Sequence, residues 1–170
     1  MRNPWIVLSC VLVVAAADAA AAQAERHVCR LLKADEIEAL LGPTVVLANV
    51  LEDSPERSVC QYEDGDDSPV FVLTVYWKGG KNQWNASIAA LRAGDKMLAS
   101  SEGVGIDSLA KAGLVRAGPV EGLGDAAYFS DLLPSMVLKG DVLLELNMAL
   151  LKDPAGKFRP LAEKLLARAR

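Results

Sequence analysis

Three segments of the chain space their apolar residues at intervals of three and four, the period of an amphipathic α-helix. The first spans 34–41 and stops at Gly42-Pro43, a pair that ends helices. The second spans about 82–98, and the third begins at about Phe158. Their buried stripes are predicted to be Ile37, Leu40 and Leu41; Trp84, Ile88 and Leu91; and Leu161, Leu165 and Leu166.

The other apolar runs are rich in β-branched and aromatic residues and are bounded by turn signals, a pattern typical of strands. Residues 142–150 alternate most clearly. One face should be wetter and carry Glu145 and Asn147, and the other should be buried and carry Val142, Leu144, Leu146, Met148 and Leu150. Residues 100–113 are rich in Ser and Gly and are predicted to be irregular. The predicted strands are 44–51, 57–63, 70–77, 115–120, 126–130, 136–139 and 142–150.

Short turns join most consecutive strands, so the sheet is predicted to be mainly antiparallel. The element order is helix, three strands, helix, three or four short strands, and a final helix. This order predicts an α+β fold in which helices pack on one face of the sheet. The length of 170 residues suits one domain, which we place at 25–170.

The first 24 residues have the pattern of an export signal. Arg2 precedes an apolar run, and Ala22-Gln23-Ala24 has the small-x-small form of a cleavage site, so we expect a cut after Ala24. The mature chain would then be periplasmic or secreted, with no membrane span. Two alternatives stay open: a retained membrane anchor, and lipidation at Cys10, whose preceding residues loosely resemble a lipobox.

Charge and composition exclude several classes of partner. Charged residues make up 24%, so the chain is not a disordered polyelectrolyte. The formal net charge is −4, so a nucleic-acid partner, which calls for a basic surface, is not expected. The chain has a single histidine, His27, which argues against a histidine-based metal site. No cofactor and no metal are predicted.

Three cysteines are present, and Cys10 leaves with the predicted signal. The remaining pair, Cys29 and Cys60, is predicted to form one structural disulfide in an oxidising compartment. A redox-active pair would more often have Cys-x-x-Cys spacing, which the sequence lacks.

Three fragments carry a family resemblance: 29–42 (CRLLKADEIEALLG), 60–62 (CQY) and 120–129 (VEGLGDAAYF). Together they resemble a set of small bacterial exported proteins and lipoproteins of unknown function, best known from actinobacteria. The resemblance implies an α+β sandwich with a Cys29–Cys60 bridge, and it implies no catalytic residues. The sequence departs from that pattern at Lys33, where Ser or Thr often caps the helix, so the cap bond is missing or made by Asp35. It also lacks a convincing lipobox.

Several short motifs favour structural over chemical interpretations. Ser108 and Lys111 match Ser-x-x-Lys, but the companion motifs of β-lactam enzymes are absent. The acidic run 63–67 lacks the spacing of a calcium loop and is predicted to be a solvated turn. Gly122, Gly124 and Asp125 are predicted to form a tight turn, with Asp125 bonding the backbone of that turn, and not a phosphate cradle.

The most suggestive cluster surrounds Gly79-Gly80. Aromatic and basic residues there could form a binding patch, consisting of Tyr76, Trp77, Lys78, Lys81 and Trp84. The first hypothesis is therefore an exported, non-catalytic binding domain for an envelope or secreted protein or a small ligand. The alternatives are an inhibitor of a secreted enzyme, with the 64–68 or 78–82 turn as its plug, and a hydrolase that uses the carboxylates of Glu145 and Asp125.

Overall fold

The computed structural model describes residues 28–43, 45–100 and 105–169 of the chain. The predicted signal 1–24, the alternative lipidation site Cys10 and the histidine His27 lie outside these residues. Within them, no helix is both long and apolar enough to cross a lipid bilayer.

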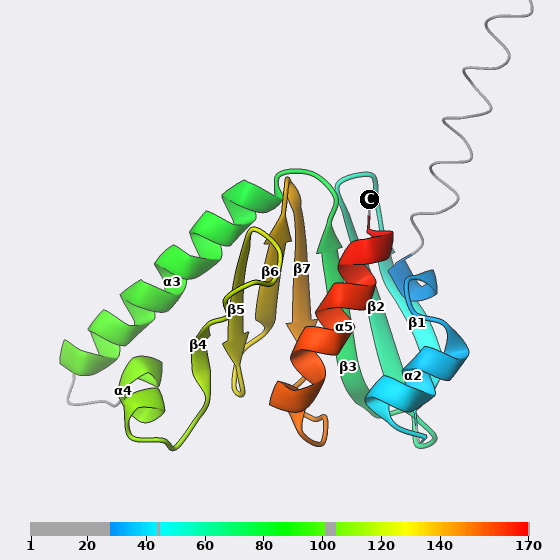
Figure 1. Cartoon of the computed structure of the whole chain (residues 1–170), viewed down its shortest axis with the longest axis horizontal. Coiled ribbons are helices and arrows are strands. Elements are labelled where there is room, and N and C mark those ends of the chain that lie inside the picture. Colours follow the sequence, from blue (N-terminus) through cyan, green and yellow to red (C-terminus); the bar gives the residue numbers. More distant parts are fainter. Residues whose placement is uncertain (1–27, 44, 101–104, 170) are drawn as a thin grey trace, which may run out of the picture.

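The described residues form one seven-stranded sheet in which all neighbouring strands are antiparallel (Figure 1). The spatial order is β1-β2-β3-β7-β6-β5-β4, so the central pair joins two strands that are far apart in sequence. The predicted α+β fold with an antiparallel sheet is therefore confirmed. The strands are β1 (Val45–Asp53), β2 (Arg57–Asp64), β3 (Pro69–Tyr76), β4 (Ala117–Pro119), β5 (Ala126–Ser130), β6 (Ser135–Lys139) and β7 (Val142–Asn147).

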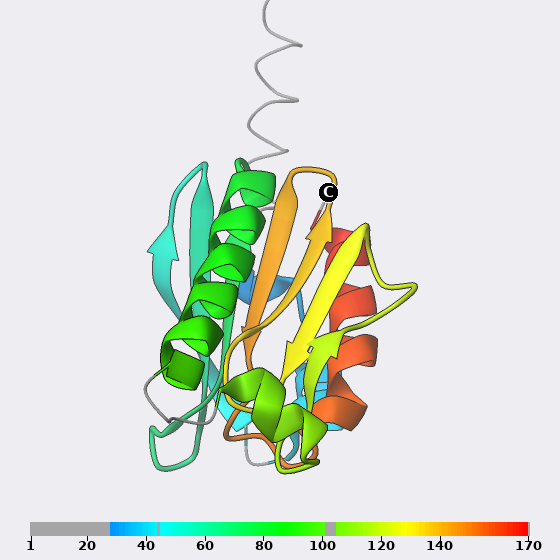
Figure 2. The same ribbon diagram turned by 90° about the vertical axis from the view of Figure 1, so that its left-hand side faces the viewer.

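Helices lie against both faces of this sheet, whereas the sequence predicted them on one. The 3₁₀ helix η1 (Val28–Arg30), α2 (Ala34–Leu41) and α5 (Pro154–Arg168) pack on one face, and α3 (Gly80–Ser100) packs on the other. Figure 2 shows α3 and α5 on opposite sides of the strands, with α3 at the front left and α5 at the right. Because β6 is apolar on both sides, it needs cover on both, and a single layer of helices cannot supply it. The short helix α4 (Ile106–Lys111) lies beside β4.

Two predicted boundaries need correction. The stretch 100–113, predicted to be irregular, contains α4. The last helix begins one turn before Phe158, at Pro154. Its start is set by Asp153, whose carboxylate accepts a hydrogen bond from the backbone amide of Gly156 at 3.2 Å, while proline occupies the favoured first position.

The disulfide fastens η1 to β2 in the core under α2 and α5. Cys29 and Cys60 are bonded, with their Cα atoms 5.2 Å apart, so the predicted bridge is confirmed. Cys60 is fully buried, and it lies beside Tyr62 and Leu73 in the same core. A buried structural disulfide is consistent with folding in an oxidising compartment.

Lys33 makes no side-chain cap bond, which confirms the first of the two alternatives. The second was wrong, because Glu36, and not Asp35, accepts a hydrogen bond from the backbone amide of Lys33 at 3.0 Å. The same carboxylate binds the guanidinium of Arg168 and the ammonium of Lys164 from α5. The cap of α2 is therefore also the polar link between the two helices on this face.

The second face of β7 is drier than predicted. Leu143, on the same side of the strand as Glu145, is 0% exposed and packs with Met136 and Leu138 against α3. Leu150, predicted to be buried, lies beyond the end of β7 and is 72% exposed. The cover supplied by α3, which strand alternation does not reveal, accounts for the first difference.

Candidate functional site

The start of α3 is tied to the turn between β6 and β7. Asp141, in that turn, accepts hydrogen bonds from the backbone amides of Gly79 at 2.7 Å and Lys81 at 3.3 Å. The amide of Gly80 donates to the backbone carbonyl of Asp141 at 2.9 Å. These bonds hold the N-terminal end of α3 on the sheet, and they lower the pKa of the Asp141 carboxyl.

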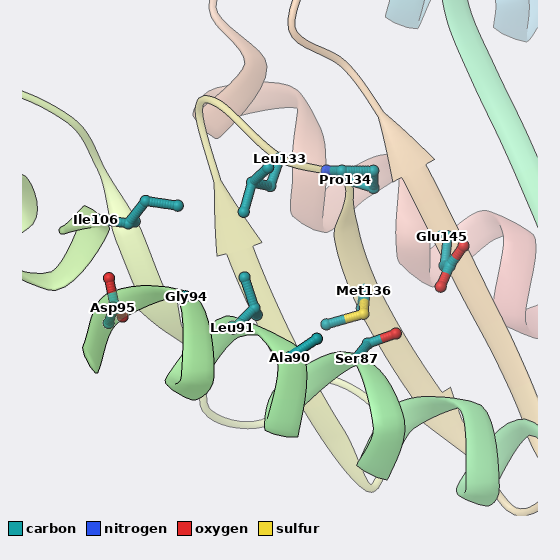
Figure 3. Close-up of a pocket in the computed structure, with 10 residues that line it drawn as sticks. All are labelled: Ser87, Ala90, Leu91, Gly94, Asp95, Ile106, Leu133, Pro134, Met136 and Glu145. Atoms are coloured by element: carbon teal, nitrogen blue, oxygen red, sulfur yellow. The ribbon is translucent and has the colours of Figure 1, made fainter. Parts of the chain in front are cut away.

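Beyond this anchor, a cavity of about 360 Å³ separates α3 from the sheet (Figure 3). We call it the α3 cavity. One wall is α3, and the opposite wall comes from the start of α4, the loop between β5 and β6, and the two strands β6 and β7. Its lining consists of Ser87, Ala90, Leu91, Gly94, Asp95, Ile106, Leu133, Pro134, Met136 and Glu145. Its volume lies in the range of small-molecule sites in proteins.

The lining is mostly apolar and its charged members are both acidic. Ala90 and Leu91 on the helix face Leu133, Pro134 and Met136 on the sheet side (Figure 3). The charged lining residues are Asp95 and Glu145, and no lysine or arginine lines the cavity within the described part of the chain. The cavity therefore combines apolar walls with negative charge.

Glu145 carries the most distinctive chemistry of the cavity. Its carboxylate accepts a long hydrogen bond, 3.4 Å, from the hydroxyl of Tyr76 on the neighbouring strand. The side-chain amide of Gln83 on α3 donates to the hydroxyl of Ser87 at 3.4 Å. Desolvation raises the pKa of the Glu145 carboxyl, and the polar side chains of Gln83 and Tyr76 oppose that rise. A half-buried carboxylate thus faces a largely apolar space.

The structure does not bring the five predicted patch residues together. Trp77 is buried in the core on the α5 side, where its indole donates to the hydroxyl of Ser58 at 2.8 Å. Tyr76 and Trp84 lie on the opposite face and pack around Met136, Leu138 and Leu143. Lys78 and Lys81 are exposed at the turn before α3 and at its start. Successive strand residues point to opposite faces, which accounts for the separation of Tyr76 from Trp77.

The predicted turn of Gly122, Gly124 and Asp125 is hydrogen-bonded to the turn between β6 and β7. Both glycines have positive φ, 69° and 63°, a conformation that glycine adopts without strain. Asp125 bonds the β6–β7 turn and not the backbone of its own turn, which corrects the expectation. It accepts from the amide of Gly140 at 2.7 Å and from the ammonium of Lys139 at 3.1 Å, and these bonds lower its pKa.

The carboxylate pair suggested for a hydrolase is not assembled. Asp125 bonds Gly140 in the β6–β7 turn, whereas Glu145 lies three residues beyond Val142, the first residue of β7, which is about 10 Å along the strand. Ser108 and Lys111 are both exposed on α4. In the acidic turn, Asp64 accepts the backbone amides of Asp66 and Ser68. Among the described residues, no group of His, Cys, Asp and Glu is placed to hold a metal ion.

Sequence reasoning missed most of the cavity. Of the lining residues, it singled out Glu145 and, in a buried helical stripe, Leu91, but it gave no site role to Ser87, Asp95 or Met136. One signal could have found the sheet side: Met136, Val137 and Leu138 are consecutive apolar residues, which is typical of a strand covered on both faces. That pattern implies a second layer of helix, and α3 is the remaining long amphipathic segment.

Comparison with known proteins assigns no family to the chain. No protein-family model matches the chain, and a search of curated proteins finds no similar sequence. The case for a function therefore rests on the geometry of the α3 cavity.

Proposed function

We propose that the protein is an exported, non-catalytic binding domain whose ligand is a small, largely apolar molecule held in the α3 cavity. The observation that carries the proposal is the cavity itself: about 360 Å³ between a helix and a sheet, with mostly apolar walls. Pockets of this size and character are typical sites for small molecules.

The same geometry favours a small ligand over a protein partner. The space lies between α3 and the sheet and opens to solvent beside the exposed residues Ala90 and Pro134, so a small molecule can enter it. The 78–82 segment, suggested as the plug of an inhibitor, is bound to the β6–β7 turn through Asp141. It is therefore not a free loop that could enter another protein's active site.

Export is the second part of the proposal. It is supported by Arg2, the apolar run that follows it and Ala22-Gln23-Ala24, and the Cys29–Cys60 bridge is consistent with it. We also propose that the chain is related to the small bacterial exported proteins and lipoproteins of unknown function that it resembles.

Mass spectrometry of the protein recovered outside the cytoplasm should give the mass of residues 25–170 with one disulfide. A mass that includes residues 1–24, or a lipid on Cys10, would contradict the cut after Ala24.

Binding is tested with N-phenyl-1-naphthylamine, a neutral probe that fluoresces in apolar surroundings. We expect a saturable rise in fluorescence with about one probe per chain. The blocking variant is Gly94→Leu, because Gly94 lines the cavity and a Cβ built on it meets no atom within 4 Å. The matched control is Ala93→Leu, on an exposed neighbouring position of α3.

Gly94→Leu should weaken probe binding, and Ala93→Leu should leave it unchanged. Circular dichroism of both variants checks that α3 is intact. Absence of saturable binding by the wild-type protein, or equal binding by the two variants, would contradict a site in the α3 cavity.

A further inference from the structure

We infer that the α3 cavity selects ligands with a cationic amine head group, which Glu145 binds while the apolar walls hold the rest of the molecule. This inference rests on the proposed function and names the class of ligand. Its basis is the position of one half-buried carboxylate and the sign of the charge around it.

The fold fixes Glu145 at the edge of an apolar surface. In the sheet register it pairs with Thr74 on β3 and with Met136 on β6. Leu143, on the same side of β7, is fully buried. The neighbouring strands β3 and β6 therefore limit where the Glu145 carboxylate can move. The carboxylate faces the cavity beside Met136 and Ser87 (Figure 3).

The carboxylate retains capacity for further donors. Two carboxylate oxygens offer about four acceptor sites. Tyr76 contributes one donor, at the long distance of 3.4 Å, and the side-chain amide of Gln83 donates to the hydroxyl of Ser87. An ammonium group has three donors and a positive charge, so it can use the remaining sites and compensate the cost of a partly desolvated anion.

The nearby cation, Arg57, acts on Glu145 only through its charge, which lowers the pKa of the carboxyl, and its direct contacts are with other groups. The guanidinium of Arg57 binds the carboxylate of Glu52 at 2.8 Å and lies over the ring of Tyr76, 5.5 Å from its centroid. It does not line the cavity, whose charged lining residues are Asp95 and Glu145. An acid head group would therefore meet like charge in the cavity, whereas an amine would meet opposite charge.

The experiment compares three ligands with one tail. Dodecylamine, dodecanol and dodecanoate, each below its critical micelle concentration, compete with N-phenyl-1-naphthylamine for the purified protein at neutral pH. Dodecylamine should displace the probe at concentrations about tenfold lower than dodecanoate, as expected for a hydrogen-bonded ion pair. Calorimetric titration with dodecylamine alone measures the same affinity without the probe.

Two variants test the role of Glu145. Glu145→Gln keeps the shape and removes the charge, so the preference for the amine should fall to less than about threefold. Ser87→Lys places a cation beside the same carboxylate on the surface of α3, and it should also abolish the preference. Glu163→Gln is the matched control, because Glu163 is exposed on α5 and does not line the α3 cavity.

The outcomes separate the inferred preference for amines from the proposed binding site on which it rests. A preference for the amine that Glu145→Gln and Ser87→Lys remove, and that Glu163→Gln retains, supports the inference. Equal displacement by the three ligands, or a preference that survives both cavity variants, overturns it and leaves an apolar binding site standing. If neither the probe nor any alkyl compound binds, the proposed function fails as well.

Discussion

The carboxylate of Asp141 accepts the backbone amide of Gly79 at 2.7 Å, across 62 residues of sequence. This bond joins the β6–β7 turn to the start of α3. The same turn is held from its other side by Asp125, which accepts the amide of Gly140. Two aspartates therefore link three turns at one end of the sheet, and this link sets where α3 begins its path across β6 and β7.

Removing the Asp141 side chain should loosen α3 and weaken ligand binding in the α3 cavity. In Asp141→Ala, the amides of Gly79 and Lys81 lose their acceptor, so their hydrogen exchange should accelerate by about tenfold. Hydrogen-exchange NMR and probe titration measure the two effects. Asp66→Ala, an equal change of charge in the exposed β2–β3 turn, is the control. Unchanged exchange at both amides would show that the aspartate does not hold the helix.

Two glycines of α3 should respond to the same substitution in opposite directions. A Cβ on Gly80 would lie 2.7 Å from the amide nitrogen of Leu143 and closer still to the carbonyl of Asp141. Gly80→Ala should therefore lower the free energy of unfolding by about 1–3 kcal/mol. Gly94→Ala meets open space within the helix and should raise it by about 0.5–1 kcal/mol. Urea unfolding followed by circular dichroism measures both, and equal effects would contradict the close approach at Gly80.

Loss of the disulfide should lower the stability of the fold. Cys29→Ser or Cys60→Ser should lower the free energy of unfolding by about 2–5 kcal/mol, because the bridge closes a long loop at the edge of the core. Chemical denaturation with and without dithiothreitol measures the loss. Reduction should destabilise the wild-type protein and leave Cys60→Ser unchanged. Free thiols at both positions in protein taken from an oxidising compartment would contradict the structural bridge.

The ionised carboxylate of Glu36 should stabilise the protein at neutral pH, and this contribution should be lost in acid. Hydrogen bonds from Arg168, then from the backbone of Lys33, hold the pKa of this carboxyl well below its ordinary value of 4.5. A carboxyl whose pKa is depressed by folding contributes stability at pH values above its unfolded pKa, and that stability is lost as the pH falls toward the folded pKa.

The test is urea unfolding between pH 7 and pH 3. The free energy of unfolding of the wild-type protein should fall over this range, and Glu36→Gln should show a smaller fall. Glu38→Gln, at an exposed position of the same helix, should follow the wild-type curve. Parallel curves for the wild type and Glu36→Gln would mean that the link between α2 and α5 adds no stability.

Local sequence signals located most elements correctly. α2 spans 34–41 as predicted, because helical spacing and the Gly42-Pro43 stop act within a few residues. α4 was missed because its six residues are too few for apolar spacing to establish a period. The start of α5 was misplaced because its signal lies in the cap, Asp153 followed by Pro154, and not in the apolar stripe.

The sequence by itself determined the α+β class, the antiparallel strands and the pairing of the two cysteines, since these follow from local periods, turns and an even thiol count. The apolar run of β6 indicated that both faces need cover, but the tertiary structure alone decided that β3 pairs with β7, which helix covers each face, and that Glu145 borders a cavity. These features depend on contacts between segments far apart in the sequence, about 70 residues for β3 and β7. The environment of Glu145 therefore depends on where α3 packs, and not on the strand that carries the residue.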